Sequence, residues 1–204
     1  MLATIFTSFL VFAAKADSDV EVKFTTSKGC FLKGEPVIAI CTISNRSNHD
    51  IFINYNCNTN LSFGCNGGLL QSNPTPIHGG ATIGPNGTEL KPNEICHLWV
   101  ALDEWSLEFH YGTNFVRSIF NYNGVKMSDR FDVNLTKSND HDLGIALGAL
   151  VAEIAATTNP QEQDVLREAI HIKQKQSPEI RPLLQTEFMS LKDIIDNADN
   201  EPID

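Results

Sequence analysis

The chain has 204 residues, and its 25 acidic side chains outnumber 15 lysines and arginines, which gives a formal net charge of −10. An acidic chain without a cluster of basic residues argues against binding to nucleic acid or to anionic lipid. The length allows one ordinary domain, or a domain of ~120 residues with an appendage.

Residues 1–16 have the pattern of a secretory signal peptide. Leu2 to Ala14 is almost continuously apolar, and Ala14-Lys15-Ala16 is a small-x-small cleavage sequence. The apolar run is shorter than the ~20 residues that a membrane-spanning helix needs. We therefore predict cleavage after Ala16, a secreted or periplasmic location and no stable membrane span after cleavage. An uncleaved N-terminal anchor is the alternative.

The region 17–136 is predicted to be mainly β. Residues 20–26 alternate between apolar and polar side chains, as in a strand with one buried face. Residues 37–43 are apolar on both faces, which is typical of a strand that is covered on both sides. The dipeptide Asn123-Gly124 favours a tight hairpin turn between two later strands. The further strands are expected at 51–55, 95–102, 114–122 and 131–135.

A glycine- and proline-rich stretch interrupts this pattern at residues 56–93. We expect a long loop there, with short edge strands near 69–71 and 88–90. About seven strands over roughly 120 residues, with frequent turn signals, indicate an antiparallel β-sandwich.

From residue 137 onward the apolar residues follow the spacing of helices. Leu143, Leu147, Leu150 and Ile154 form one stripe, and Asn159-Pro160 has the residues of a second helix start. A third helix is expected from about Pro182. We therefore predict a helical appendage at 137–204 with about three helices and a frayed acidic tail. Most of the net negative charge of the chain lies in this appendage.

The stretch Cys30 to Ile53 resembles the second and third strands of bacterial immunoglobulin-like domains. In those domains a G-E-P-V turn, here residues 34–37, precedes the core strand, and an N-x-S turn, here 45–47, follows it. Residues 89–94 and 112–117 are similar to later turns and strands of the same family. The resemblance covers about residues 20–135 and implies an immunoglobulin-like β-sandwich. It implies no particular function, because this fold carries many.

Five cysteines follow the predicted cleavage site, so they are candidates for disulfides. Cys57 and Cys65 bracket a short loop and could close it. Cys41 and Cys96 lie in predicted core strands and could join two sheets. Cys30 is then left over. The alternative for Cys41 is a small buried apolar residue.

The long loop and the turn after residue 102 contain apolar side chains that are candidates for contact with a partner. Binding loops on a rigid sandwich often carry such residues. The alternative is that they fold back and cover the core. The candidates are Phe63, Leu69, Leu70, Ile77 and Trp105.

The sequence contains no recognised nucleophile, phosphate-binding or metal-binding motif, so we predict no catalytic residue, cofactor or metal ligand. The favoured hypothesis is a secreted or periplasmic, non-catalytic module that binds a protein partner through the long loop. One alternative is an inhibitor of an extracytoplasmic protease, with the Cys57–Cys65 loop as the inserted segment. Another is a hydrolase with an unrecognised site.

Overall fold

The computed structural model describes residues 19–54, 61–72, 87–105, 107–177, 180 and 182–183. The predicted signal peptide, Cys57, Ile77 and the acidic tail lie outside the described residues. The elements, in chain order, are β1 Val20–Thr26, β2 Phe31–Leu32, β3 Ile38–Asn45, β4 Ile51–Asn54, β5 Leu61–Cys65, β6 Gln71–Ser72, β7 Gly87–Leu90, β8 Ile95–Ala101, the 3-10 helix η1 Leu102–Trp105, β9 Gly112–Tyr122, β10 Val125–Thr136, α2 Asp140–Ala156 and α3 Pro160–Gln176.

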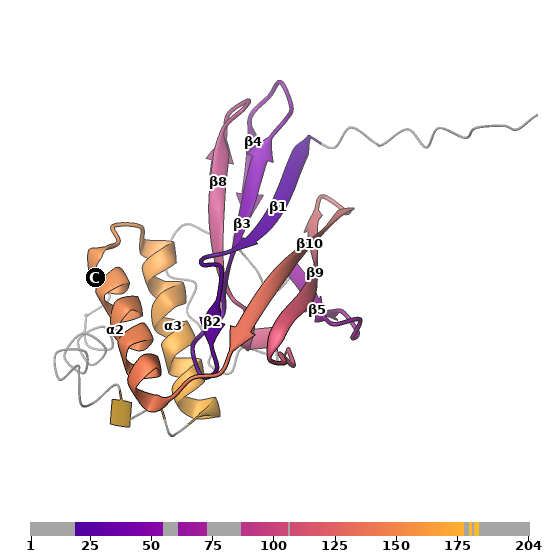
Figure 1. The fold of residues 1–204 in the computed structure, drawn as a ribbon. Coiled ribbons are helices and arrows are strands. Elements are labelled where there is room, and N and C mark those ends of the chain that lie inside the picture. Colours follow the sequence, from indigo (N-terminus) through magenta and orange to yellow (C-terminus); the bar gives the residue numbers. More distant parts are fainter. Residues whose placement is uncertain are drawn as a thin grey trace, which may run out of the picture.

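Two sheets make up most of the β region (Figure 1). The first has the order β1-β3-β8 and is antiparallel throughout. The second has the order β2-β10-β9-β5-β6, in which only the short β2 runs parallel to its neighbour. Strands β4 and β7 form a separate antiparallel pair. The prediction of a mainly β region with antiparallel sheets is confirmed.

One hydrophobic core receives side chains from both sheets. At its centre the Phe63 ring meets Phe24 edge-on at 5.6 Å between centroids, and it meets Trp105 at 4.9 Å. Phe24 in turn stacks on Phe131 of the second sheet at 5.9 Å. Aromatic contacts of this kind add to the free energy that burial alone provides. Because β5 supplies Phe63, this strand is part of the core.

The strand β5 was not predicted, since residues 56–93 were expected to be a loop. Leu61 and Phe63 point into the core, while Ser62 and Gly64 point the other way. The apolar alternation is only a few residues long, and the asparagine- and glycine-rich residues around it have the composition of a loop. Pairing with the long β9 is what makes this short stretch a strand.

The predicted hairpin turn at Asn123-Gly124 joins β9 to β10. Both turn residues have positive φ, 49° and 82°, which is the backbone of a two-residue type I′ turn. The turn pairs Tyr122 with Val125, and the register then continues without a bulge to Gly112 opposite Leu135. Strand β10 consequently starts at Val125, well before the predicted 131.

Helices α2 and α3 both begin at asparagine caps, of which the sequence suggested Asn159 and not Asn139. The side chain of Asn139 accepts a hydrogen bond from Asp142 N, and Asn159 accepts from Gln161 N and Glu162 N. The helices bury one apolar stripe each against Ile38 and Ala101, so they cover part of the outer face of the β1-β3-β8 sheet (Figure 1).

The buried Asp103 carboxylate joins α3 to the sheet region. The Lys173 ammonium lies 2.6 Å from the buried Asp103 carboxylate in η1. The same carboxylate accepts the Val37 N–H at 2.8 Å. Within the described residues there are two helices, not about three, and the expected third helix from Pro182 lies almost wholly outside them. No helix in the described part of the chain is long and apolar enough to cross a membrane.

Candidate functional site

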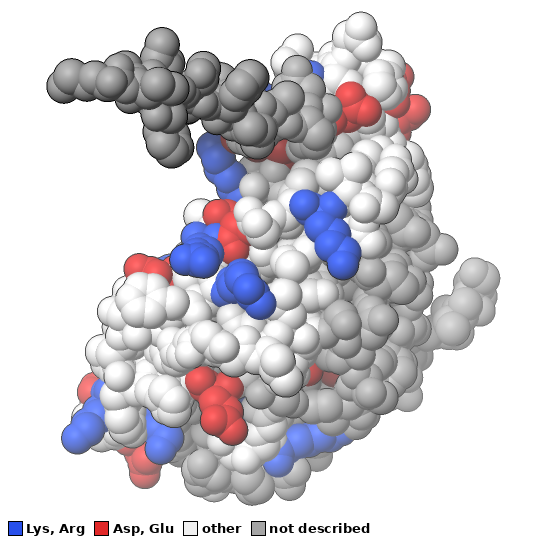
Figure 2. All heavy atoms as spheres, turned by 90° about the vertical axis from the view of Figure 1, so that its right-hand side faces the viewer, with Lys and Arg blue, Asp and Glu red and all other residues white. Residues whose placement is uncertain are grey.

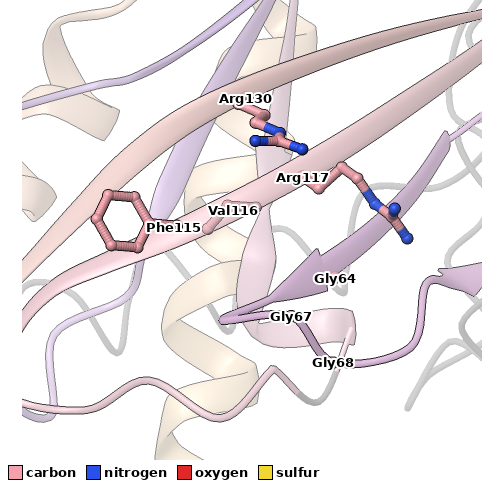
Figure 3. A pocket seen from close by; sticks show the side chains of 7 residues that line it. All are labelled: Gly64, Gly67, Gly68, Phe115, Val116, Arg117 and Arg130. Atoms are coloured by element: carbon pink, nitrogen blue, oxygen red, sulfur yellow. The ribbon is translucent and has the colours of Figure 1, made fainter.

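A shallow hollow lies on the outer face of the second sheet, where β5, β9 and β10 run side by side (Figure 3). Its volume is about 280 Å³. The residues that line it are Gly64, Gly67, Gly68, Phe115, Val116, Arg117 and Arg130.

A row of three directly paired residues forms the centre of this hollow. Arg117 of β9 lies opposite Arg130 of β10 on one side and opposite Gly64 of β5 on the other. Side chains alternate between the two faces of a strand, and the neighbours Val116 and Phe131 point into the core. Both arginines therefore point outward. Gly64 has no side chain, and the backbone of residues 68 and 69 lies close over it, beside Arg117.

The two arginines have no acidic partner within the described part of the chain, where neither forms an ion pair within 4.0 Å. Asp129, next to Arg130, is already engaged. Its carboxylate accepts the Phe24 N–H at 2.7 Å and the Arg130 backbone N–H at 2.8 Å. Like charges placed directly opposite on neighbouring strands destabilise a sheet. The hollow thus contains two arginines that form no ion pair with a described residue, and Asp132 lies on the same face of β10, opposite Phe115.

The turn from β5 to β6 forms one wall of the hollow. Asn66 and Gly67 both have positive φ, 50° and 82°, and Gly68 N donates to Cys65 O at 2.8 Å. The Asn66 side chain fastens this turn to β9, because its Oδ1 accepts the Phe115 N–H at 3.0 Å and its Nδ2 donates to Asn114 Oδ1 at 2.9 Å. The wall is therefore held in place by several bonds.

Two apolar side chains flank the charged centre. Phe115, two residues before Arg117 on the same face of β9, is 64% exposed, and Leu69, just after the turn, is 90% exposed. Figure 2 shows the molecule from this side, with Lys and Arg side chains exposed across the middle of the face. Exposed apolar groups beside unpaired charges are typical of contact surfaces.

The chemistry of the hollow is that of a receptor for an anion. Arginine stays protonated at any physiological pH, and its guanidinium can hold a carboxylate through two parallel hydrogen bonds. The residues that line the hollow include no group that exchanges protons near neutral pH. Among the described residues, no group of three His, Cys, Asp or Glu side chains is placed to hold a metal ion.

The predicted partner contacts divide into three groups. Phe63 and Trp105, two of the candidates, are 0% and 1% exposed and belong to the core, which agrees with the alternative that these apolar side chains cover the core. Phe63 is drawn inward by the pairing of β5 with β9, and Trp105 by its packing on Phe63. Leu69 is exposed and Leu70 is half-buried. Ile77 lies outside the described residues.

The predicted disulfide between Cys41 and Cys96 is wrong. The two residues lie on neighbouring strands of one sheet, where Cys41 pairs with Leu98 and Cys96 with Ile43. They are therefore diagonal neighbours, ~7–8 Å apart and beyond the usual reach of a disulfide. Burial raises the pKa of the Cys96 thiol to about 11 and also raises the pKa of Cys65.

The remaining cysteines differ in setting. The structure has no disulfide among the described cysteines. The proposed Cys57–Cys65 pair stays a prediction, because Cys57 lies outside the described residues. Cys30 is exposed. Cys41 is fully buried in β3, in agreement with the alternative of a small core residue.

Arg117 and Arg130 were not among the predicted site residues, although the sequence holds the signal for them. A two-residue turn at 123–124 pairs residues at equal distances from it, which places position 117 opposite position 130. The alternation of both strands then puts both arginines on the outer face. Gly64 could not be placed beside them, because β5 was not recognised as a strand.

No known protein family and no curated protein matches the chain. Among solved structures, it is similar to the sporulation control protein Spo0M from Bacillus subtilis, with a TM-score of 0.35, 11% identity, and coverage of 67% of this chain and 56% of that chain. It is also similar to the Pseudomonas fluorescens alkylpurine DNA glycosylase AlkC bound to DNA, with a TM-score of 0.33, 12% identity, and coverage of 58% of this chain and 31% of that chain.

A FixG-related protein from Vibrio parahaemolyticus is also similar, with a TM-score of 0.29, 8% identity, and coverage of 60% of this chain and 99% of that chain. The chain thus spans about a third of the glycosylase and just over half of Spo0M. Similarity at this level assigns neither fold family nor function.

Proposed function

We propose that the β region is an immunoglobulin-like sandwich that serves as a binding module outside the cytoplasm, either secreted or periplasmic. The strand order supports the fold. Immunoglobulin-like domains place their first, second and fifth strands in one sheet and their third, sixth and seventh in the other. With β2, β4 and the short β6 and β7 set aside, the sheets β1-β3-β8 and β10-β9-β5 follow that division.

The observation that carries the binding role is the pair of directly opposed arginines, without an ion pair to any residue that the structure describes, in a hollow with apolar flanks. The pairing works against folding, and the hollow contains no buried polar network that would need it. A contact with an anionic group of a partner would offset the repulsion between the two arginines. The turn after β5 that forms its wall lies in the predicted binding loop, so the contact surface combines that loop with the β9-β10 hairpin.

The experiment that tests this role compares partner capture by surface variants. The purified protein and its Phe115→Ser and Leu69→Ser variants would be used as baits in extracts of the cells that produce it. Ile145→Ser is the matched control, because Ile145 is 56% exposed but lies on α2, away from the hollow. We expect wild type and the control to retain the same protein and the two hollow variants to lose it. Equal capture by all four proteins would contradict the proposal.

The two alternatives, an inhibitor of an extracytoplasmic protease and a hydrolase, remain predictions. For the inhibitor, Leu61–Cys65 is a paired strand and is not an exposed loop. Within the described residues this leaves fewer positions for an inserted segment.

A further inference from the structure

The geometry points to an acidic peptide segment as the ligand of the Arg117–Arg130 hollow. This inference rests on the proposed binding function and specifies the chemical class of the partner. An Asp or Glu carboxylate of the partner would lie between the two guanidiniums. A neighbouring apolar side chain of the same peptide would cover Phe115 or Leu69.

The first argument is the charge. Two guanidiniums that stand directly opposite each other on paired strands can approach one carboxylate together, or each can bind one of two adjacent carboxylates. Figure 3 shows both side chains emerging from neighbouring strands on the same side of the sheet. A carboxylate in this place replaces the repulsion between the arginines by two attractions. Arginine suits it better than lysine would, because the planar guanidinium matches a carboxylate in geometry.

The second argument is the shape. The volume of about 280 Å³ is just below the ~300–1,000 Å³ of sites that enclose small molecules, and the hollow is open to solvent. It therefore accommodates one or two side chains of a longer ligand. The wall of the hollow lies close over β5 because position 64 is glycine. A Cβ there would lie 3.1 Å from both Gly68 O and Leu69 O, so even alanine would press on the wall.

The third argument separates a peptide from other polyanions. A net charge of −10 repels long polyanions such as nucleic acid or sulfated glycans. Over the Debye length of about 8 Å at physiological salt, however, a short acidic motif meets mainly the local charges, which are the two arginines and Asp132 on the same face of β10. The exposed Phe115 and Leu69 add apolar contact area, which an acidic peptide with a hydrophobic neighbour can use.

The test is a selection of random short peptides displayed on phage, with the full-length protein as target. We expect the selected peptides to be enriched in Asp or Glu next to an aromatic or aliphatic residue. The best peptide, synthesised with a fluorophore, would then be titrated against wild type and variants. Arg117→Ala and Arg130→Ala should each weaken binding about tenfold or more. Arg117→Lys should also weaken it, because the charge remains but the paired hydrogen bonds are lost.

Arg46→Ala is the matched control, since Arg46 is an exposed arginine that pairs with Glu21 on the first sheet and should not affect binding. A thermal melt of each variant confirms that it is folded. The inference is overturned if the selection yields no enrichment of acidic residues, or if peptide affinity is the same in Arg117→Ala, Arg130→Ala and wild type. If Phe115→Ser still abolishes capture of the cellular partner while the selected peptides are not acidic, only this inference fails and the binding function stands.

Discussion

The side-chain amide of Gln161, at the start of α3, bonds both backbone groups of Trp99 in β8, as a neighbouring strand would. Its Nε2 donates to Trp99 O at 3.0 Å, and its Oε1 accepts the Trp99 N–H at 3.1 Å. Because β8 is an edge strand of its sheet, its outward backbone groups would otherwise offer a template for another chain. The helix therefore protects the sheet edge as well as covering its face.

Replacing this glutamine should destabilise the protein and expose the edge. We expect Gln161→Ala to lower the free energy of unfolding by about 1–3 kcal/mol, since two backbone groups of Trp99 lose their partner. Urea denaturation followed by Trp fluorescence measures this, and light scattering measures association. Gln174→Ala, the same change in the same helix, should be close to neutral. An equal loss in both variants would mean that the edge contact is not responsible, because alanine has a higher helix propensity than glutamine.

A charge reversal in the hollow should separate stability from binding. In Arg130→Glu an acidic side chain would face Arg117, and opposite charges across a strand pair are worth roughly 0.2–1 kcal/mol. We expect the melting temperature to rise slightly while the affinity for acidic peptides is lost. Arg130→Gln provides the neutral comparison and should fall between wild type and the reversed variant in stability. A lower melting temperature for Arg130→Glu than for Arg130→Gln would show that the two arginines do not repel each other in the fold.

The free energy of unfolding should depend on pH through Glu104, which lies in η1. Burial, together with the charges of Glu168 and Asp103, raises the pKa of Glu104 from 4.5 to about 7. The folded state then binds more protons than the unfolded state between these two pH values, so the free energy of unfolding falls as pH rises through this window. We expect Glu104→Gln to flatten this dependence and to be more stable than wild type at pH 7 and above. Urea denaturation over this pH range, with Glu108→Gln as the exposed control, measures it; parallel curves would contradict the assignment.

Gly87 should not tolerate a side chain. A Cβ at this position would overlap the Ile53 carbonyl oxygen and the Phe52 ring, which lies over Gly87 in the β4-β7 pair. We expect Gly87→Ala to cost about 1–3 kcal/mol, as overpacking does. Gly29→Ala is the control, because nothing lies within 4 Å of a Cβ there and its φ is not positive. Similar unfolding midpoints for the two alanine variants would contradict the steric explanation.

The core should tolerate phenylalanine at position 105 far better than alanine. The Trp105 ring is buried, and its Nε1 has no hydrogen-bond partner among the described residues. Phenylalanine therefore loses volume but no hydrogen bond, whereas Trp105→Ala should cost about 3–5 kcal/mol. Chemical denaturation of both variants checks the order. A Trp105→Phe variant as unstable as Trp105→Ala would point to a bonded indole nitrogen.

Those parts of the fold that depend on local signals could be read from the sequence. The cap Asn159, the apolar stripe of α2 and the turn at Asn123-Gly124 are all local patterns, so the two helices and the last hairpin were foreseen. The boundary expected at residues 136 and 137 falls between β10 and α2.

The features that were missed depend on distant pairing. Leu61–Cys65 becomes a strand only because β9 is beside it, and this pairing decides that Phe63 is buried. Trp105 is buried because its ring packs against Phe63. The diagonal placement of Cys41 and Cys96 depends on the register of β3 and β8, which no local pattern records.

The turn at Asn123-Gly124 does more than reverse the chain, because its length sets what faces Arg117. A slip of the β9-β10 pairing by one residue would bring Asp129 opposite Arg117 in place of Arg130, and would rotate Phe131 out of the core. The same register therefore sets both the arginine pair on the outer face and the aromatic residues in the interior. A slip would replace two like charges by a neutral ion pair and, in the same step, open the core of the fold.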